Sequence, residues 1–208
     1  MRLCGGNKMK LLFNENTIEY IDSPFVEEII QKTNELLKDE FYFSHYIADG
    51  VEVNETPELF LEKNILKINT LEIIALQAKE FVDTLLLSAE EYTNRAVPYI
   101  KELVDEFYNS PSPTSWKSLG ELFEGIQWLS SMINLVDQSI VRPITWDSVM
   151  EKASIIQDEL ESFEEALESA DTVLIADLLQ YEILPVFEEL QVTMKLTIDT
   201  EGTRHDLN

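Results

Sequence analysis

One change in hydrophobic periodicity, at about Leu76, constrains the fold of this chain more than any other feature. Up to that point, short apolar and aromatic runs alternate with turn residues, as in strands joined by tight turns. Beyond it no alternating pattern occurs, and apolar residues recur at the three- and four-residue spacing of helices. The sequence therefore predicts an α+β protein, with a sheet domain over residues 9–76 and a helical domain over residues 77–198.

The sheet domain begins with a predicted β-hairpin. Lys10–Phe13 and Thr17–Ile21 flank the turn residues Asn14-Glu15-Asn16, and asparagine tolerates a positive φ. Ser23-Pro24 follows and supplies an N-cap and a proline suited to a first helical turn. The next apolar positions form one stripe of an amphipathic helix: Val26, Ile29, Ile30, Thr33 and Leu37.

The rest of the sheet domain is rich in turn and cap residues. A predicted aromatic strand, Phe41–Ile47, leads to the tight-turn dipeptide Asp49-Gly50 and a brief return strand, Val51–Val53. Thr56-Pro57 caps a short helical turn, and Thr70–Leu76 closes the domain as an alternating strand. Alternation in the aromatic strand places Phe41, Phe43, His45 and Ile47 on one face, and Tyr42, Ser44 and Tyr46 on the other.

This order of elements, with Asn64-Ile65, Lys67 and Thr70-Leu71-x-Ile73-Ile74, resembles the ubiquitin-like β-grasp family over about Met9 to Leu76. The resemblance implies a β-grasp fold and a recognition patch on the outer face of the sheet. The positions that match this patch are Tyr46 and Ile74, with Leu12 nearby; alternatively, these residues pack on the helical domain. Conjugation through a free C-terminal Gly-Gly is excluded, because Leu76 runs directly into helical sequence.

The helical domain contains about four amphipathic segments with short connections, which favour an up-and-down bundle. They span about residues 76–109, 115–141, 145–170 and 171–198, and Thr145 caps the third. Pro98 predicts a kink or a break near Asn94, because proline removes a helical hydrogen bond. Gly120 and Gly125 lower helix propensity, so we expect another backbone to pass close to them.

Both ends of the chain lie outside these domains. Gly5-Gly6 precedes Met9 in the way that a ribosome-binding sequence precedes a start codon, which suggests a native start at Met9 and a bacterial source. Residues 1–8 are then a translated leader or, alternatively, a disordered arm. Residues 199–208 are polar, and we expect a flexible tail.

The net charge of -25, from 15 basic and 40 acidic residues, excludes nucleic acid and anionic membrane surfaces as partners. It allows a protein partner with a basic or an apolar surface. No Lys or Arg occurs between Lys152 and Lys195, and the acidic residues there include Glu161, Glu165 and Glu168. We interpret these three as a candidate docking ridge; the alternative is a solvated helix face.

The sequence shows no catalytic, cofactor-binding or metal-binding pattern. Phosphate-loop, dinucleotide-binding and Gly-x-Ser-x-Gly motifs are missing. A di-iron bundle needs Glu-x-x-His pairs, and neither His45 nor His205 follows a glutamate by three residues. Cys4 is the only cysteine, so a disulfide within the chain is excluded. The remaining catalytic hypothesis is acid–base chemistry by a carboxylate in a cleft lined by Tyr92 and Tyr181.

These observations favour a cytoplasmic, non-enzymatic protein–protein interaction or adaptor protein with no cofactor. A homodimer through apolar residues around Trp116 or Trp146 is a further possibility. One alternative is a chaperone for a secreted or flagellar subunit, a class in which small acidic helical proteins are common. The other is an enzyme or ligand carrier with its site in the helical bundle.

Overall fold

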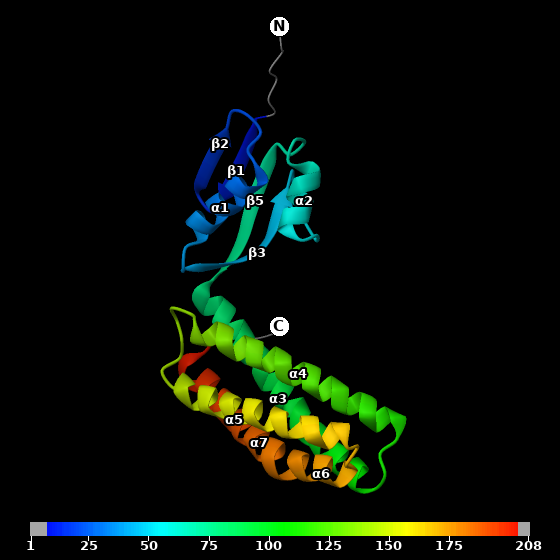
Figure 1. Ribbon diagram of the computed structural model, residues 1–208. Coiled ribbons are helices and arrows are strands. Elements are labelled where there is room, and N and C mark those ends of the chain that lie inside the picture. Colours follow the sequence, from blue (N-terminus) through cyan, green and yellow to red (C-terminus); the bar gives the residue numbers. More distant parts are fainter. Residues whose placement is uncertain (1–7, 204–208) are drawn as a thin grey trace. The chain divides into compact units, whose positions relative to one another are not determined.

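The computed structural model describes residues 8–203 and has the predicted α+β architecture, with strands followed by helices (Figure 1). The chain divides into two compact units between Phe81 and Val82, whereas the sequence pattern puts the division after residue 76. The first turn of helix α3 (Ala78–Tyr108) packs with the sheet unit, which accounts for the difference. The Ala78 amide donates to the Glu40 carbonyl oxygen over 2.8 Å, and Phe81 stacks on Tyr42 with ring centroids 4.1 Å apart.

The N-terminal unit has the predicted order of elements. Its strands are β1 (Met9–Phe13), β2 (Asn16–Tyr20), β3 (Phe41–Ala48), β4 (Val51–Glu52) and β5 (Thr70–Gln77), and its helices are α1 (Val26–Leu37) and α2 (Pro57–Asn64). The strands form one sheet in the order β2-β1-β5-β3-β4. Strand β1 runs parallel to β5, and the other neighbouring strands are antiparallel.

The two predicted tight turns are confirmed by backbone conformation. Asn14 has a φ of 51°, and Asp49 and Gly50 have φ values of 48° and 83°. Asp49-Gly50 has the positive φ at both central residues that a tight two-residue hairpin turn favours, whereas in the first turn only Asn14 has it. The Asp49 carboxylate also accepts hydrogen bonds from the amides of Asn69 (3.2 Å) and Thr70 (2.8 Å), so this turn is tied to the start of β5.

Helix α1 covers one face of the sheet. Ile29, Thr33 and Leu37 are buried, which confirms the predicted stripe. The predicted cap at Ser23-Pro24 is wrong: the N-cap is Phe25, whose apolar side chain makes no capping hydrogen bond. Side chains from α1, α2 and the sheet form the core of this unit: Met9, Leu11, Phe13, Ile29, Leu37, Tyr46, Val53, Leu61, Ile68, Leu71 and Ile73.

The C-terminal unit is a helical bundle with its own core. Its helices are α3, α4 (Pro113–Asp137), α5 (Trp146–Glu168), α6 (Thr172–Asp177) and α7 (Leu184–Glu201), and the π-helical segment η1 (Leu178–Ile183) joins the last two. The four predicted segments therefore exist, and successive long helices run in opposite directions (Figure 1). Trp146, Phe107, Phe163 and Phe187 are the largest fully buried side chains in this core.

Prolines and glycines behave differently from expectation in this bundle. Helix α3 continues through Pro98, so of the kink or break expected near Asn94 the break is not found. Pro185, by contrast, lies in the first turn of α7, one residue after the π-helical segment, at a position where a proline is tolerated. The expected backbone contact at Gly120 and Gly125 is wrong, since Gly120 faces open space and Gly125 contacts the side chain of Tyr92.

The predicted flexible tail is wrong for residues 199–201, which form the last turn of α7. The Glu201 carboxylate accepts hydrogen bonds from the amides of Ile144 (2.7 Å) and Thr145 (3.2 Å), and these bonds fix the end of the helix. The leader hypothesis for residues 1–8 concerns a segment of which only Lys8 is among the described residues. His205 also lies outside them.

Candidate functional site

The outer face of the sheet, opposite α1, carries two of the three residues predicted to form a recognition patch. Leu12 pairs with Glu72 in the sheet register and Ile74 pairs with His45; both aliphatic side chains are half-buried, and neither belongs to the core. Glu72 pairs on its other side with Ile47, which is also half-buried and outside the core. We call Leu12, Ile47 and Ile74 the sheet-face patch; Glu72 lies between its members.

The prediction that Tyr46 belongs to this patch is wrong. Tyr46 is only 2% exposed, and its hydroxyl lies 2.7 Å from that of Thr33 on α1, so it points to the inner face. A bulge between Phe43 and His45 shifts the register of β3 and reverses the faces of the residues after it. Ile47 therefore occupies the outer position that the simple alternation assigned to Tyr46.

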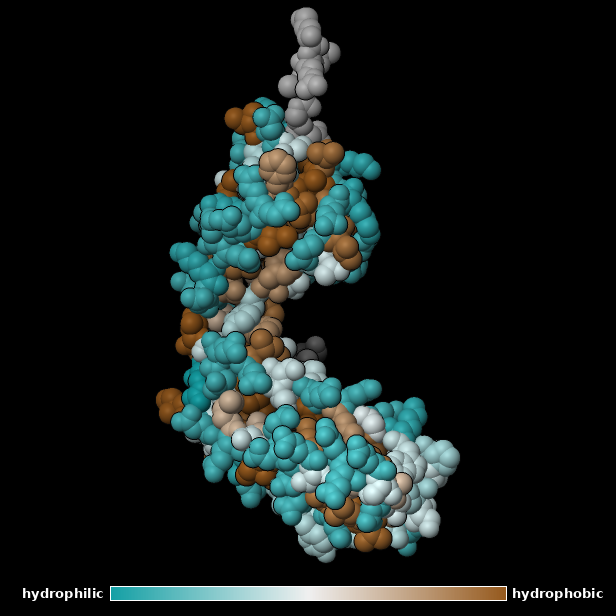
Figure 2. Space-filling model, in the orientation of Figure 1, coloured by the Kyte–Doolittle hydropathy of each residue, from teal (hydrophilic) through white to brown (hydrophobic). Residues whose placement is uncertain are grey.

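The acidic residues Glu161, Glu165 and Glu168 lie on α5 and are exposed. Among the described residues, their carboxylates form no ion pair. Other acids of the same stretch have structural partners: Glu188 pairs with Lys101 at 2.7 Å, and Glu189 pairs with Lys152. Hydrophilic residues cover much of the visible face of each unit (Figure 2), so the acidity of α5 is part of a generally polar surface.

A groove of about 300 Å³ lies between α3 and α4. Tyr92 and Tyr99 form its walls, Ala96 and Leu122 its floor, and Arg95 and Glu121 its charged rim. Tyr92 packs against Trp128 and Phe187, at ring-centroid distances of 5.5 and 6.3 Å. Burial raises the pKa of Tyr92 to about 12. The Tyr99 hydroxyl donates to the Ser118 carbonyl oxygen over 3.1 Å, so both walls are held in place.

Tyr181, considered together with Tyr92 as lining a catalytic cleft, does not line the groove between α3 and α4. Tyr181 instead interacts with Tyr108, the last residue of α3, whose hydroxyl donates to Asp177 of α6. The carboxylate at the rim of the α3–α4 groove, Glu121, is exposed, and its hydrogen bond with Lys117 lowers its pKa. A general acid needs the opposite environment, a buried carboxyl with a raised pKa.

The sequence suggested a homodimer contact around Trp116 or Trp146, and the structure buries both side chains at least partly. Trp146 is fully buried, and its Nε1 donates to the Ile133 carbonyl oxygen over 3.2 Å, so it cannot contact a second copy. Trp116 is half-buried against Phe107. The exposed tryptophan is Trp128, which sequence reasoning missed although it lies off the apolar stripe of α4.

Within residues 8–203, no three His, Cys, Asp or Glu side chains are close enough to hold a metal ion. His45 shares a hydrogen bond of 3.0 Å with Ser44 through Nδ1. None of the described helices is both long and apolar enough to cross a membrane.

The fold thus defines an α+β protein in which a five-stranded sheet unit precedes an acidic helical bundle. Residues 84–193, from the first turns of α3 into α7, match the family described as Domain of unknown function (DUF8042), and the chain belongs to that family. Comparison with curated proteins and with solved structures gives no match. The family therefore covers the bundle and its α3–α4 groove, while the sheet-face patch lies outside the matched residues.

Proposed function

We propose that this protein is a non-enzymatic adaptor that binds another protein through the sheet-face patch of a ubiquitin-like unit. The strand order β2-β1-β5-β3-β4, with β1 parallel to β5 and α1 across one face, supports the β-grasp resemblance. Fold alone does not define a function, so the proposal depends on the chemistry of the patch.

The observation that carries the proposal is the grouping of Leu12, Ile47 and Ile74 around Glu72 on the face opposite α1. Aliphatic side chains on a rigid sheet bury apolar area on binding without ordering a loop. The central carboxylate and the net charge of -25 favour a partner that presents an apolar side chain next to a lysine or arginine.

Capture from the native host with paired variants tests this proposal. The full chain and a Val51→Asp control should retain the same partner, since Val51 is exposed and pairs with Ala48 rather than with a patch residue. An Ile47→Asp/Ile74→Asp variant should lose that partner at least tenfold, because two buried carboxylates would be unpaired at the contact. Circular dichroism checks that each variant is folded. Equal recovery by the double variant would show that the patch is not the binding surface.

A further inference from the structure

A small cleft opens on the opposite side of the sheet unit, between α1, β3 and α2. Its volume is about 120 Å³. Ile30, Phe43 and Pro57 give it apolar walls, Thr33 and Tyr46 supply two hydroxyl groups, and Glu58 lies at its edge. A cleft of this size accepts one side chain rather than a cofactor, since cofactor and drug-sized ligands occupy roughly 300–1,000 Å³.

The two hydroxyl groups form a directed hydrogen-bond chain. Thr33 Oγ1 donates to the Ile29 carbonyl oxygen over 2.8 Å, which uses its only proton. The 2.7 Å contact between Thr33 and Tyr46 must then have Tyr46 as the donor. Both residues are at most 3% exposed, and burial raises the pKa of Tyr46, so the phenol stays protonated. The Tyr46 hydroxyl uses its proton in the hydrogen bond to Thr33, and its oxygen can still accept a hydrogen bond from another donor.

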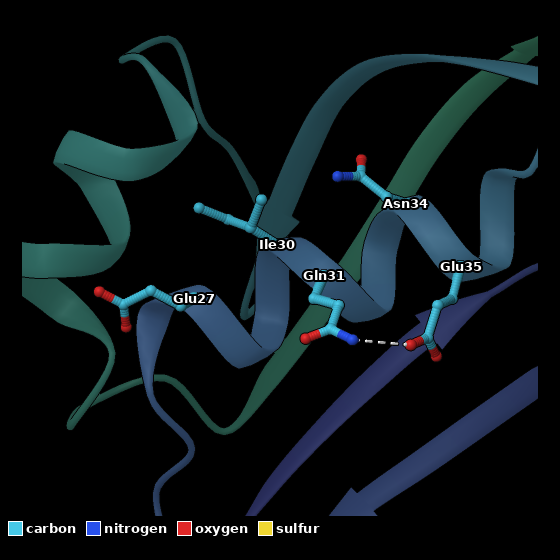
Figure 3. A pocket seen from close by; sticks show the side chains of 5 residues that line it. All are labelled: Glu27, Ile30, Gln31, Asn34 and Glu35. Carbon is cyan, nitrogen blue, oxygen red and sulfur yellow. Dashed lines mark hydrogen bonds between the residues drawn. The ribbon is translucent and has the colours of Figure 1, made fainter.

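Acidic side chains lie at this cleft and at the neighbouring groove. Glu58 stands at the cleft. Ile30 and Asn34 also line a second groove along α1, which Glu27, Gln31 and Glu35 border (Figure 3). Glu35 already pairs with Lys32 at 2.8 Å. In the part of the chain that the structure describes, neither Glu27 nor Glu58 has an ion-pair partner. A cation entering the cleft would therefore meet the uncompensated carboxylate of Glu58, with that of Glu27 on the neighbouring groove.

We propose that this cleft binds a lysine side chain of a partner protein. The ammonium group donates to Tyr46 Oη and lies beside the Glu58 carboxylate, while the aliphatic stem packs on Ile30, Phe43 and Pro57. Lysine fits better than arginine, because a planar guanidinium needs several acceptors in its plane and the cleft provides one hydroxyl oxygen and one carboxylate. The site is separate from the sheet-face patch and stands whether or not that patch binds.

Titration of the isotope-labelled full chain with Nα-acetyl-lysine methylamide at low salt tests the proposal. Amide shifts should be confined to the cleft, at Thr33, Asn34, Tyr46 and Glu58, during a titration to about 100 mM, which covers the affinity of a single charged side chain. The same compound acetylated at Nε has no charge and should cause no shifts at these positions. Glu58→Gln should weaken binding about fivefold, the effect of one exposed charge pair. Glu62→Gln, one turn further along α2, is the matched control and should change affinity less than twofold.

Several results would overturn the proposal. Absence of cleft shifts with the charged compound is one, and equal weakening by Glu58→Gln and Glu62→Gln, which indicates only general attraction to an acidic protein, is another. Tyr46→Phe should reduce affinity several-fold through loss of the acceptor, with its melting temperature measured in parallel. Tighter binding of butane-1,4-diamine than of the lysine compound would identify a free polyamine as the occupant, against a peptide lysine.

Discussion

Replacing Gly125 with alanine tests how the α3–α4 groove is built. A Cβ atom at Gly125 would lie 2.1 Å from Tyr92 Oη and 2.6 Å from its Cζ, far inside van der Waals contact. Gly120, on the same helix, has no atom within 4 Å of the equivalent position. The two glycines are therefore a matched pair with opposite expectations.

The change in the free energy of unfolding follows from the helix propensity that each alanine adds and from the side chain that it displaces. At Gly120 the substitution adds helix propensity only, about 1 kcal/mol. At Gly125 the Tyr92 ring must leave its place between Trp128 and Phe187. That movement costs about 1.5–3 kcal/mol of burial and roughly 0.5–1.5 kcal/mol of aromatic contact. Gly125→Ala should thus destabilise the helical unit by about 1–3.5 kcal/mol after the propensity gain, while Gly120→Ala stabilises it.

Urea unfolding followed by far-ultraviolet circular dichroism measures this difference, and alkaline titration of tyrosine absorbance gives an independent readout. The pKa of Tyr92 is raised to about 12 by burial, so an expelled ring in Gly125→Ala should ionise at lower pH. In a Tyr92→Leu background the Gly125→Ala penalty should shrink, as expected for two groups in contact. If Gly125→Ala were as stabilising as Gly120→Ala, the close packing of the Tyr92 side chain against Gly125 would be refuted.

Three further substitutions address charge and helix ends. Glu165→Gln removes like-charge repulsion from the acidic residues one turn away on each side, so the helical unit should gain about 0.5 kcal/mol at low salt and nothing at about 1 M salt. Glu201→Gln should cost about 1 kcal/mol in urea unfolding, because it weakens the acceptor for two amides at the start of α5. Asp177→Asn should lower the pKa of Tyr108 from about 12 toward 10, since the hydrogen bond to Asp177 is the main cause of the rise; tyrosine absorbance measures it.

Each of these expectations has a clear contrary outcome. A gain at Glu165 that persists in high salt would not be electrostatic, and an unchanged urea midpoint for Glu201→Gln would show that water replaces the carboxylate. For Tyr108, the folded pKa lies above the unfolded value, so the stability it confers is complete below about pH 10 and is lost as the pH rises through about 12. An identical alkaline titration of Asp177→Asn and the unsubstituted protein would contradict the hydrogen-bond account.

Features set by neighbouring residues could be predicted from the sequence. Asp49-Gly50 adopts the turn that its residue types favour. Thr145 stands at the N-cap position of α5 as expected, but its side chain makes no capping hydrogen bond and donates to Glu201 instead. Features that depend on distant residues could not. The role of Gly125 depends on Tyr92, a residue of another helix, and no local pattern distinguishes it from Gly120. The last turn of α7 likewise depends on hydrogen bonds between Glu201 and the amides of residues more than fifty positions earlier.

Strand β3 shows how one unpaired residue can change a functional assignment. Phe43 pairs with Ala75 and His45 with Ile74, so Ser44 is the extra residue of the bulge. Before it Phe43 faces inward; after it Tyr46 does, and their rings meet at 4.8 Å. A strict period of two would have separated these rings. Both proposed sites depend on this bulge, because it directs Ile47 to the sheet-face patch and Tyr46 to the cleft beneath α1.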